Sequence, residues 1–187
     1  MRIIGGRWRG RRLEVAPVPG LRPTPDRVRE TLFNWLRPYL PGARCLDLFA
    51  GSGALGFEAL SRGAGAVVMV DSHPAVVTAL RRSAAALGTA GLQVVQADVL
   101  RFLDGPGKPY DIVFLDPPYG EGLLAPCCAR LARGGWLAAG AQVYLEAERG
   151  LGTPQVPAGW EVVRSKHAGE VGYHLAAIEG GDAGHRS

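Results

Sequence analysis

The feature that most constrains the fold is a regular alternation of short apolar segments with helical segments, which begins at residue 44. The apolar segments are "RCLDLFA", "AVVMVD", "LQVVQAD", "YDIVFLD" and "AQVYLEAE". Near-continuous Val, Leu and Ile in strands that alternate with helices indicate a mostly parallel sheet with helices on both faces. The closing segments "WEVVRSKH" and "VGYHLAAIE" predict a hairpin that adds antiparallel character at one edge of an α/β fold.

The first 40 residues are predicted to form an extension of this sheet. "RIIGGRWRGRRLEV" predicts a β-hairpin, because Gly5-Gly6 suits the positive-φ turn between antiparallel strands. Thr24 and Pro25 then have the chemistry of a helix N-cap and a first helical position. The apolar residues of the following helix recur at helical spacing and are expected to face a core: Val28, Leu32, Trp35, Leu36 and Tyr39.

Length and composition indicate one globular domain. The chain has 187 residues, 47% of them hydrophobic and 20% charged. We expect an N-terminal extension over residues 1–40, the main domain over residues 41–179 and a disordered tail over residues 180–187. No apolar run approaches the roughly 20 residues of a membrane span, and the N-terminus lacks the apolar core of a secretory signal. The three cysteines have no metal-binding spacing, so we expect a reduced, cytoplasmic protein without a metal or a membrane contact.

The basic residues are concentrated at the N-terminus. The first 37 residues hold nine arginines and three acidic residues, whereas the net charge of the whole chain is only +4. This distribution suggests that one end of the molecule contacts a polyanion, although an arginine-rich genome would explain the bias equally well. The candidate contacts alternate along one short segment: Arg7, Trp8, Arg9, Arg11 and Arg12. Arginines would contact phosphates, and Trp8 would either stack on an unpaired base or pack in a small core beneath the segment.

A glycine loop follows the first strand of the alternation. In "DLFAGSGALG", Gly51, Gly53 and Gly56 have G-x-G-x-x-G spacing between a strand and a helix. Glycine permits a tight turn there, and it leaves nothing between the backbone and a ligand at the start of the helix. An isolated match would be weak support, but in this context the loop predicts binding of a nucleotide-like ligand.

Three acidic residues narrow the choice of ligand. Asp71 ends the second strand, where an acid typically holds ribose hydroxyls of either NAD or S-adenosylmethionine. Asp47 lies within the first strand, and an acid there suits a ligand with a cationic amino-acid end better than a pyrophosphate. Asp98 ends the third strand and would either bind an adenine amine or cap the short helix that follows.

The stretch "FLDPPYG" places an acid, two prolines and an aromatic residue at the end of the fourth strand. With a methyl donor bound, the Asp116 carboxylate and the Pro117 carbonyl can accept hydrogen bonds from an exocyclic amine and free its lone pair. Pro118 helps to hold that carbonyl outward, since proline fixes φ and has no N–H donor. Tyr119 provides a ring on which a base stacks, so catalysis would depend on positioning and electrostatics.

The combination of "DPPY" with "DLFAGSGALG" resembles the class I S-adenosylmethionine-dependent methyltransferases that act on amines. The blocks "MRIIGGRWRGRRL" and "RPTPDRVRETLFNWL" are similar to the bacterial small-subunit rRNA guanine-N2 methyltransferases, and the similarity runs from Met1 to about Ile178. The resemblance implies a Rossmann-like three-layer sandwich with a seven-stranded sheet. It also implies methyl transfer to N2 of a guanine in 16S rRNA of the small ribosomal subunit, by a monomer.

The resemblance also implies roles for individual residues. Asp116, Pro117, Pro118 and Tyr119 would form the catalytic site, and the cofactor would contact Asp47, Gly51, Gly53, Asp71 and Asp98. The segment "RPTPDRVRE", which spans Arg22–Glu30, would close over the cofactor pocket. The family often has phenylalanine at the position of Tyr119, and either ring can stack.

Three other functions remain open at this stage. A relative that methylates another amine, such as DNA adenine, would share the DPPY motif, although the arginine-rich segment and the lack of a separate DNA-recognition domain count against it. A non-catalytic assembly factor would have no need for the intact Asp47 and Asp116. A nicotinamide oxidoreductase would explain the glycine loop but not DPPY.

Overall fold

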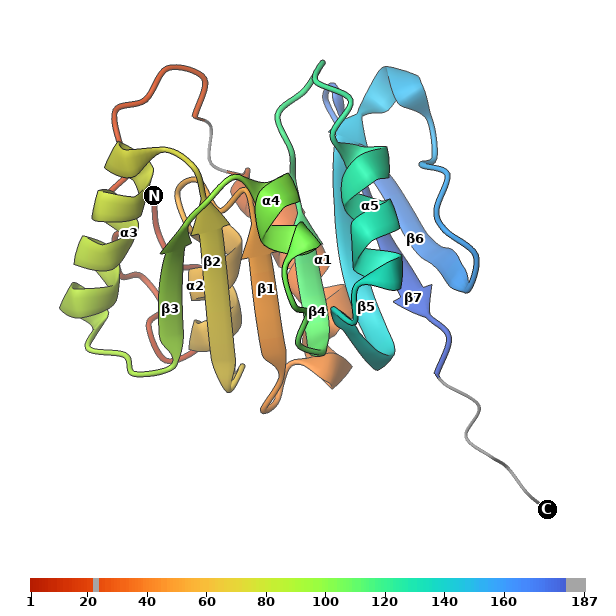
Figure 1. Cartoon of the computed structure of the whole chain (residues 1–187). Coiled ribbons are helices and arrows are strands. Elements are labelled where there is room, and N and C mark those ends of the chain that lie inside the picture. Colours follow the sequence, from red (N-terminus) through yellow and green to blue (C-terminus); the bar gives the residue numbers. More distant parts are fainter. Residues whose placement is uncertain (22–23, 181–187) are drawn as a thin grey trace.

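The computed structural model describes residues 1–21 and 24–180, and it is built on a seven-stranded sheet (Figure 1). The strand order is β3-β2-β1-β4-β5-β7-β6. The strands are β1 Arg44–Leu48, β2 Ala66–Asp71, β3 Leu92–Gln96, β4 Tyr110–Leu115, β5 Leu137–Glu148, β6 Trp160–Ala168 and β7 Val171–Ile178. Strands β1 to β5 pair in parallel, and β7 runs antiparallel to both β5 and β6. The expected parallel sheet with a C-terminal antiparallel hairpin is therefore confirmed.

Helices cover both faces of the sheet and make three layers (Figure 1). The helices are α1 Asp26–Leu36, α2 Ala54–Ser61, α3 Pro74–Leu87, α4 Val99–Asp104 and α5 Leu124–Arg133, with short 3₁₀ turns at Arg37–Tyr39 and Arg149–Leu151. One buried apolar cluster joins α1, α2 and α3 to the sheet, and a second joins α4 and α5 to its other face. None of the helices in the described ranges is long and apolar enough to cross a membrane.

Helix α1 differs in two details from the sequence expectation. Pro25 is the N-cap residue, and the helix begins at Asp26 without a side-chain cap, so the prediction of Thr24 for that role is wrong. Tyr39, expected in the core, is 45% exposed. The chain changes from α to 3₁₀ geometry at Arg37, just before Pro38, and the tighter turn rotates Tyr39 away from the buried stripe. The other four predicted positions face inward, with Trp35 half-buried and stacked on Tyr173.

The N-terminal segment packs against the α2 face of the sheet. Its antiparallel pairing is limited to one bridge between Arg2 and Arg12, and the chain between them forms a wider turn than one at Gly5-Gly6 alone. Ile3, Trp8 and Leu13 belong to the same buried cluster as α1, α2 and α3. Residues 1–13 therefore share the main hydrophobic core. Residues 181–187 of the tail predicted over 180–187, and the Arg22–Pro23 part of the predicted cofactor lid, lie outside the described residues.

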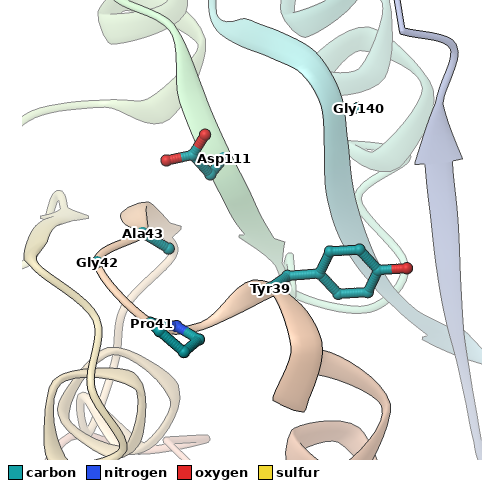
Figure 2. A pocket seen from close by; sticks show the side chains of 6 residues that line it. All are labelled: Tyr39, Pro41, Gly42, Ala43, Asp111 and Gly140. Atoms are coloured by element: carbon teal, nitrogen blue, oxygen red, sulfur yellow. The ribbon is translucent and has the colours of Figure 1, made fainter.

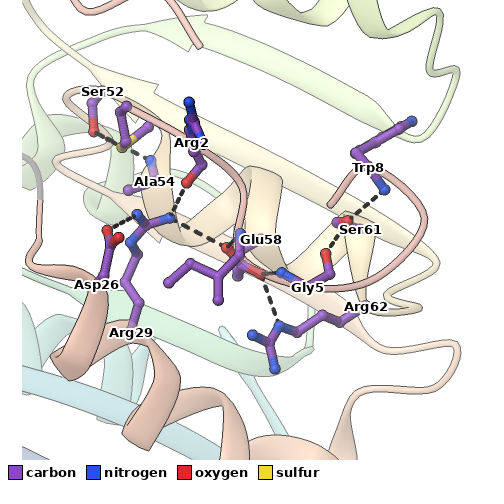
Figure 3. Close-up of polar contacts among 12 residues, drawn as sticks. Arg2, Gly5, Trp8, Asp26, Arg29, Ser52, Ala54, Glu58, Ser61 and Arg62 are labelled. Atoms are coloured by element: carbon purple, nitrogen blue, oxygen red, sulfur yellow. Dashed lines mark hydrogen bonds and ion pairs between the residues drawn. The ribbon is translucent and has the colours of Figure 1, made fainter. Parts of the chain in front are cut away.

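A buried carboxylate on α2 anchors this segment (Figure 3). Glu58 is fully buried and accepts hydrogen bonds from the backbone N–H groups of Ile4 and Gly5, both at 2.9 Å. Its oxygens also pair with Arg29 Nη1 at 3.2 Å and Arg62 Nε at 2.8 Å. The buried Arg29 guanidinium reaches further, to the Arg2 carbonyl at 2.9 Å. One acid thus fixes α1, α2 and the N-terminal segment relative to one another.

Ser61, a second residue on α2, also binds the backbone of the N-terminal segment. Ser61 Oγ accepts a hydrogen bond from the Trp8 N–H at 3.0 Å and donates one to the Gly5 carbonyl at 2.6 Å (Figure 3). Together with Glu58, it satisfies three backbone N–H groups of the N-terminal segment that have no strand partner.

We expect Glu58→Ala to lower the free energy of unfolding by about 3–5 kcal/mol, because it removes the buried carboxylate partner of Arg29 and leaves only the pair with the exposed Asp26. Urea unfolding of the purified protein measures this change. Glu30→Ala, which removes an exposed acid on α1, is the matched control and should change stability by less than about 0.5 kcal/mol. Similar losses of stability in the two variants would contradict the anchoring role of Glu58.

Candidate active site

The candidate site lies where the strand order reverses. Strands β1 and β4 are neighbours at the centre of the sheet, and the chain winds outward from them in opposite directions. Open α/β sheets bind ligands at such a switch point, in the crevice outside the carboxyl ends of the strands. The glycine loop follows β1 and the DPPY turn follows β4. Because β1 and β4 are parallel, both segments emerge at the same edge of the sheet.

The glycine loop depends on left-handed backbone conformations. Phe49, Gly51 and Gly53 have φ values of 58°, 55° and 79°. Gly53 is the N-cap of α2, and a Cβ added to it would lie 2.5 Å from the Phe57 ring, so a larger residue does not fit. The Gly51 N–H donates a hydrogen bond to Asp71 Oδ2 at 3.0 Å. The predicted ribose-binding acid therefore also ties the glycine loop to the end of β2.

Asp47 is a buried carboxylate beneath this loop. Its side chain is 2% exposed, and Oδ2 accepts a hydrogen bond from the Gly56 N–H at 3.0 Å. Burial raises the pKa of Asp47 well above its usual range, and the nearby charge of Asp71 raises it further, whereas the Gly56 hydrogen bond acts in the opposite direction. Within residues 1–21 and 24–180, Asp47 forms no salt bridge. A cationic group of a ligand would supply the missing partner.

Asp98 has a structural role that the sequence had left open. It is the N-cap of α4, and its Oδ1 accepts a hydrogen bond from the Arg101 N–H at 3.1 Å. The side chain is exposed, so contact with a ligand amine remains geometrically possible and stays a prediction.

The DPPY turn extends the site from β4. Asp116 is half-buried, Pro117 is buried, and Pro118 and Tyr119 are exposed. Burial raises the pKa of Asp116 well above its usual range, and the charges of Glu146 and Asp47 add to the increase. Asp47 on β1 pairs with Phe114 on β4, two residues before Asp116, so the two acids lie on the same face of the sheet. Tyr119 is 45% exposed, so its ring is available to a substrate base.

Sequence reasoning missed Glu146 on the neighbouring strand β5. Its side chain is 6% exposed, and Oε2 accepts a hydrogen bond from the Tyr144 hydroxyl at 2.9 Å. Burial raises the pKa of Glu146, and hydrogen bonds with Tyr144 and Asp116 partly offset that increase. A signal is present in "VYLEAE", where an acid interrupts an apolar segment that is predicted to be buried. The sequence does not show its partner, because that partner lies on another strand.

The predicted RNA-contacting residues lie away from this edge. Arg7, Arg9, Arg11 and Arg12 are exposed, whereas Trp8 is only 9% exposed and belongs to the core. The Arg7 guanidinium carbon lies 4.2 Å from the Trp8 ring centroid and covers it. For Trp8 the structure therefore agrees with the packing alternative and not with base stacking.

The position of the arginines along the helices follows from their hydrogen bonds. The Arg7 N–H bonds to the carbonyl of Ser61, the last residue of α2, and Arg11 Nη2 bonds to the Ala86 carbonyl near the end of α3. Helices α2 and α3 both begin at the edge of the sheet that carries the candidate site, so Arg7 and Arg11 lie at the far ends of the two helices.

A pocket at the opposite edge of the sheet lacks the features of the site (Figure 2). It is lined by Tyr39, Pro41, Gly42, Ala43, Asp111 and Gly140. Ala43 precedes β1, and Asp111 lies near the start of β4 and accepts the Arg44 N–H at 2.9 Å. The pocket is therefore at the amino ends of the strands, away from the glycine loop and Asp116.

The residues at the carboxyl edge fit S-adenosylmethionine. The buried Asp47 carboxylate suits an ammonium group, and the backbone at Gly51 and Gly53 has no side chain that would block the close approach of a ligand. Asp71 stands at the end of β2, beside that loop. S-Adenosylmethionine carries both an ammonium and a sulfonium, which matches an acidic edge better than a pyrophosphate does.

Comparisons with known proteins agree with this site. The family described as conserved hypothetical protein 95 matches residues 1–177. The chain is 51% identical over 175 residues to ribosomal RNA small subunit methyltransferase D of Escherichia coli K12, across 94% of this chain and 88% of that protein. It is 44% identical to the protein of the same name from Haemophilus influenzae, across 94% and 92%.

A solved structure gives the same result for the fold. The putative methyltransferase yhhF from Escherichia coli superposes with a TM-score of 0.90 at 47% identity, over 96% of this chain and 98% of that one. The fold is thus that of the class I methyltransferases. The chain belongs to the family of the ribosomal RNA small subunit methyltransferases D, and it is a methyltransferase whose methyl donor is S-adenosylmethionine.

Proposed function

We propose that this protein transfers a methyl group from S-adenosylmethionine to the exocyclic N2 amine of a guanine in 16S rRNA of the small ribosomal subunit. The observation that carries the proposal is the acidic DPPY turn beside the glycine loop, at the carboxyl edge of the central strands. The names of the 51% and 44% identical relatives support the ribosomal substrate. We further propose that the protein works as a cytoplasmic monomer.

The chain's own residues would activate the amine by orientation. The lone pair of a guanine N2 amine is delocalised into the ring, so the nitrogen is a poor nucleophile. Asp116 and the Pro117 carbonyl would each accept one N–H, which draws the nitrogen toward tetrahedral geometry and frees its lone pair. Tyr119 would stack on the base and fix its angle. Bound S-adenosylmethionine supplies an electrophilic methyl carbon on a sulfonium.

The exposed arginines would bind the RNA at a distance from the reacting base. Arg7 and Arg9 flank the far end of α2, and α2 has eight residues, so the arginines and the catalytic edge are separated by about 12 Å or more along that helix. An RNA that reached both would have to lie along the α2 and α3 face. Phosphate contacts at Arg7, Arg9, Arg11 and Arg12 would position the substrate, and the DPPY turn would select the amine.

The proposal is tested by mapping methyl groups in 16S rRNA from a strain that lacks this protein. Small subunits from that strain are incubated with the purified enzyme and labelled S-adenosylmethionine, and the product is located by mass spectrometry. We expect one N2-methylguanine to be missing and then restored. Label transfer to duplex DNA adenine, with every rRNA methyl group still present in the strain, would overturn the rRNA assignment.

Asp116→Ala should lower kcat by about 100-fold or more, because it removes one acceptor of the amine protons. The Kd for S-adenosylmethionine should stay within about threefold of wild type, measured by calorimetry. Glu121→Gln, which neutralises an exposed acid just after the turn, is the matched control and should retain activity. Near-normal turnover of Asp116→Ala would refute its catalytic role.

Asp47→Asn should weaken S-adenosylmethionine binding by about 10- to 100-fold, the equivalent of a hydrogen bond to a charged group, ~1.5–3 kcal/mol. The ionised form of Asp47 would hold the ammonium, so wild-type affinity should fall as the pH drops through the raised pKa of Asp47.

A carboxyl whose pKa is raised on folding stabilises the fold only at low pH, and it destabilises the ligand-free protein once ionised. Asp47→Asn should therefore raise the Tm of the ligand-free protein at pH 8. Unchanged affinity and Tm would exclude this role.

Replacing Arg9 and Arg12 together with alanine should weaken binding to small-subunit RNA. The dependence of log Kd on log salt should flatten by up to about 0.7–0.9 for each phosphate interaction that the substitutions remove. Arg133→Ala, which removes an exposed arginine at the end of α5 on the opposite face, should leave the slope unchanged. Equal slopes for wild type and the double variant would show that these arginines do not contact the RNA.

A further inference from the structure

Asp116 and Glu146 are placed side by side by the register of two parallel strands. Phe114 pairs with Tyr144 and Leu115 pairs with Leu145 across β4 and β5, so the next position brings Asp116 beside Glu146. Asp47 on β1 pairs with Phe114 on β4. Its side chain therefore lies on the same face of the sheet as those of Asp116 and Glu146. Asp116 is the first residue after β4, so the end of that strand sets its position beside β5.

Tyr144 fixes Glu146 within this arrangement. The Tyr144 side chain is fully buried, packs edge-on against Phe114, and donates its hydroxyl hydrogen bond to Glu146 Oε2 at 2.9 Å. Glu146 itself is 6% exposed. A carboxylate this deeply buried is costly unless it is paired, so its surroundings determine its charge.

The two acids have no cationic partner within residues 1–21 and 24–180, where neither Asp116 nor Glu146 takes part in a salt bridge. The groups that face them are acids and phenols: Asp47 on β1, Tyr119 in the turn, Tyr144 and Glu148 on β5, and Tyr173 on β7. Lys166 pairs with Tyr173, which in turn pairs with Glu146, so Lys166 lies two strands away from Glu146 on the exposed edge strand β6.

Two adjacent carboxyl groups can share a hydrogen bond only when one of them holds a proton. Burial and mutual repulsion raise the pKa of Asp116, and burial raises the pKa of Glu146, so the second ionisation of the pair is disfavoured. In the form that shares a hydrogen bond, the pair holds one proton and carries a single negative charge.

We propose that Glu146, held by Tyr144, is the proton-sharing partner of Asp116 and takes up the proton that Asp116 passes on during methyl transfer. The inference rests on the proposed amine methylation. Glu146 acts through Asp116 and is therefore a positioning residue, whereas Asp116 touches the substrate.

The proton and electron balance of the step is complete. The N2 lone pair forms a bond to the methyl carbon, and the carbon–sulfur bond breaks with its electron pair remaining on sulfur. The methylated nitrogen gives one proton to Asp116, and the proton already shared by the pair moves to Glu146. The positive sulfonium and the singly negative pair thus become a neutral thioether and two neutral carboxyl groups.

Glu146→Gln separates this role from a purely structural one. The amide has the size of the carboxyl group and can still bond to Tyr144 and Asp116, but it carries no charge and accepts no proton. Because the Glu146 charge raises the pKa of Asp116, the variant should have more ionised Asp116 at any given pH. A mechanism that uses Asp116 alone therefore predicts equal or higher activity for the variant at pH 6.

The inference predicts the opposite result. For Glu146→Gln, kcat on small subunits should fall by about 10- to 100-fold at both pH 6 and pH 8, with KM and S-adenosylmethionine affinity within about threefold of wild type. Tyr144→Phe, which removes only the hydrogen bond to Glu146, should give a smaller reduction in kcat. Glu148→Gln, at the next position on the same face of β5, is the matched control and should retain activity within about twofold.

The outcomes separate the inference from the function on which it rests. An active wild type with an equally active Glu146→Gln variant would overturn the inference alone. A wild-type enzyme that transfers no methyl group to RNA would overturn the proposed function and the inference with it. A reduction in kcat for Glu148→Gln as large as that for Glu146→Gln would also overturn the inference. The loss of any negative charge on this face of β5 would then have the same effect.

Discussion

The close approach of α2 to β1 is the constraint on which the rest of the structure depends. Gly56 has no side chain, so its N–H reaches Asp47 Oδ2 at 3.0 Å, and a Cβ there would collide with Met69. This contact sets the angle at which the glycine loop leaves β1. It also buries Asp47, an acid that suits a cationic ligand. The same hydrogen bond therefore positions both the α2 helix and the Asp47 carboxylate.

The placement of α2 has a second consequence at the other end of the molecule. Glu58 and Ser61 lie on the same helix and bind the backbone of the N-terminal segment, so the arginines are held against the main domain. The N-terminal arginines and the glycine loop are thus attached to opposite ends of one helix. The DPPY turn after β4 is supported separately, by β5, which places the Glu146 carboxyl group beside Asp116.

Much of the fold was predictable from the sequence because its signals are local. The alternation of apolar strands with helices, the glycine spacing and the DPPY turn each depend on neighbours within a few residues. The strands of the alternation, the antiparallel end and the loop positions appear in the structure, whereas the predicted N-terminal hairpin is reduced to one bridge between Arg2 and Arg12. The error at Tyr39 occurred where the local geometry changes from α to 3₁₀ over one or two residues.

The sequence by itself determined which residues are candidates for the chemistry: the glycines, Asp47, Asp71 and the DPPY turn, since their residue types and spacing suit only a few ligands. Tertiary structure alone decided which of them lie close together. Trp8 became a core residue because Arg7 and α2 cover it, and Glu146 joined Asp116 because parallel pairing brings positions 30 residues apart into the same row. Burial and cross-strand register arise from contacts distant in the chain, and a local pattern cannot encode them.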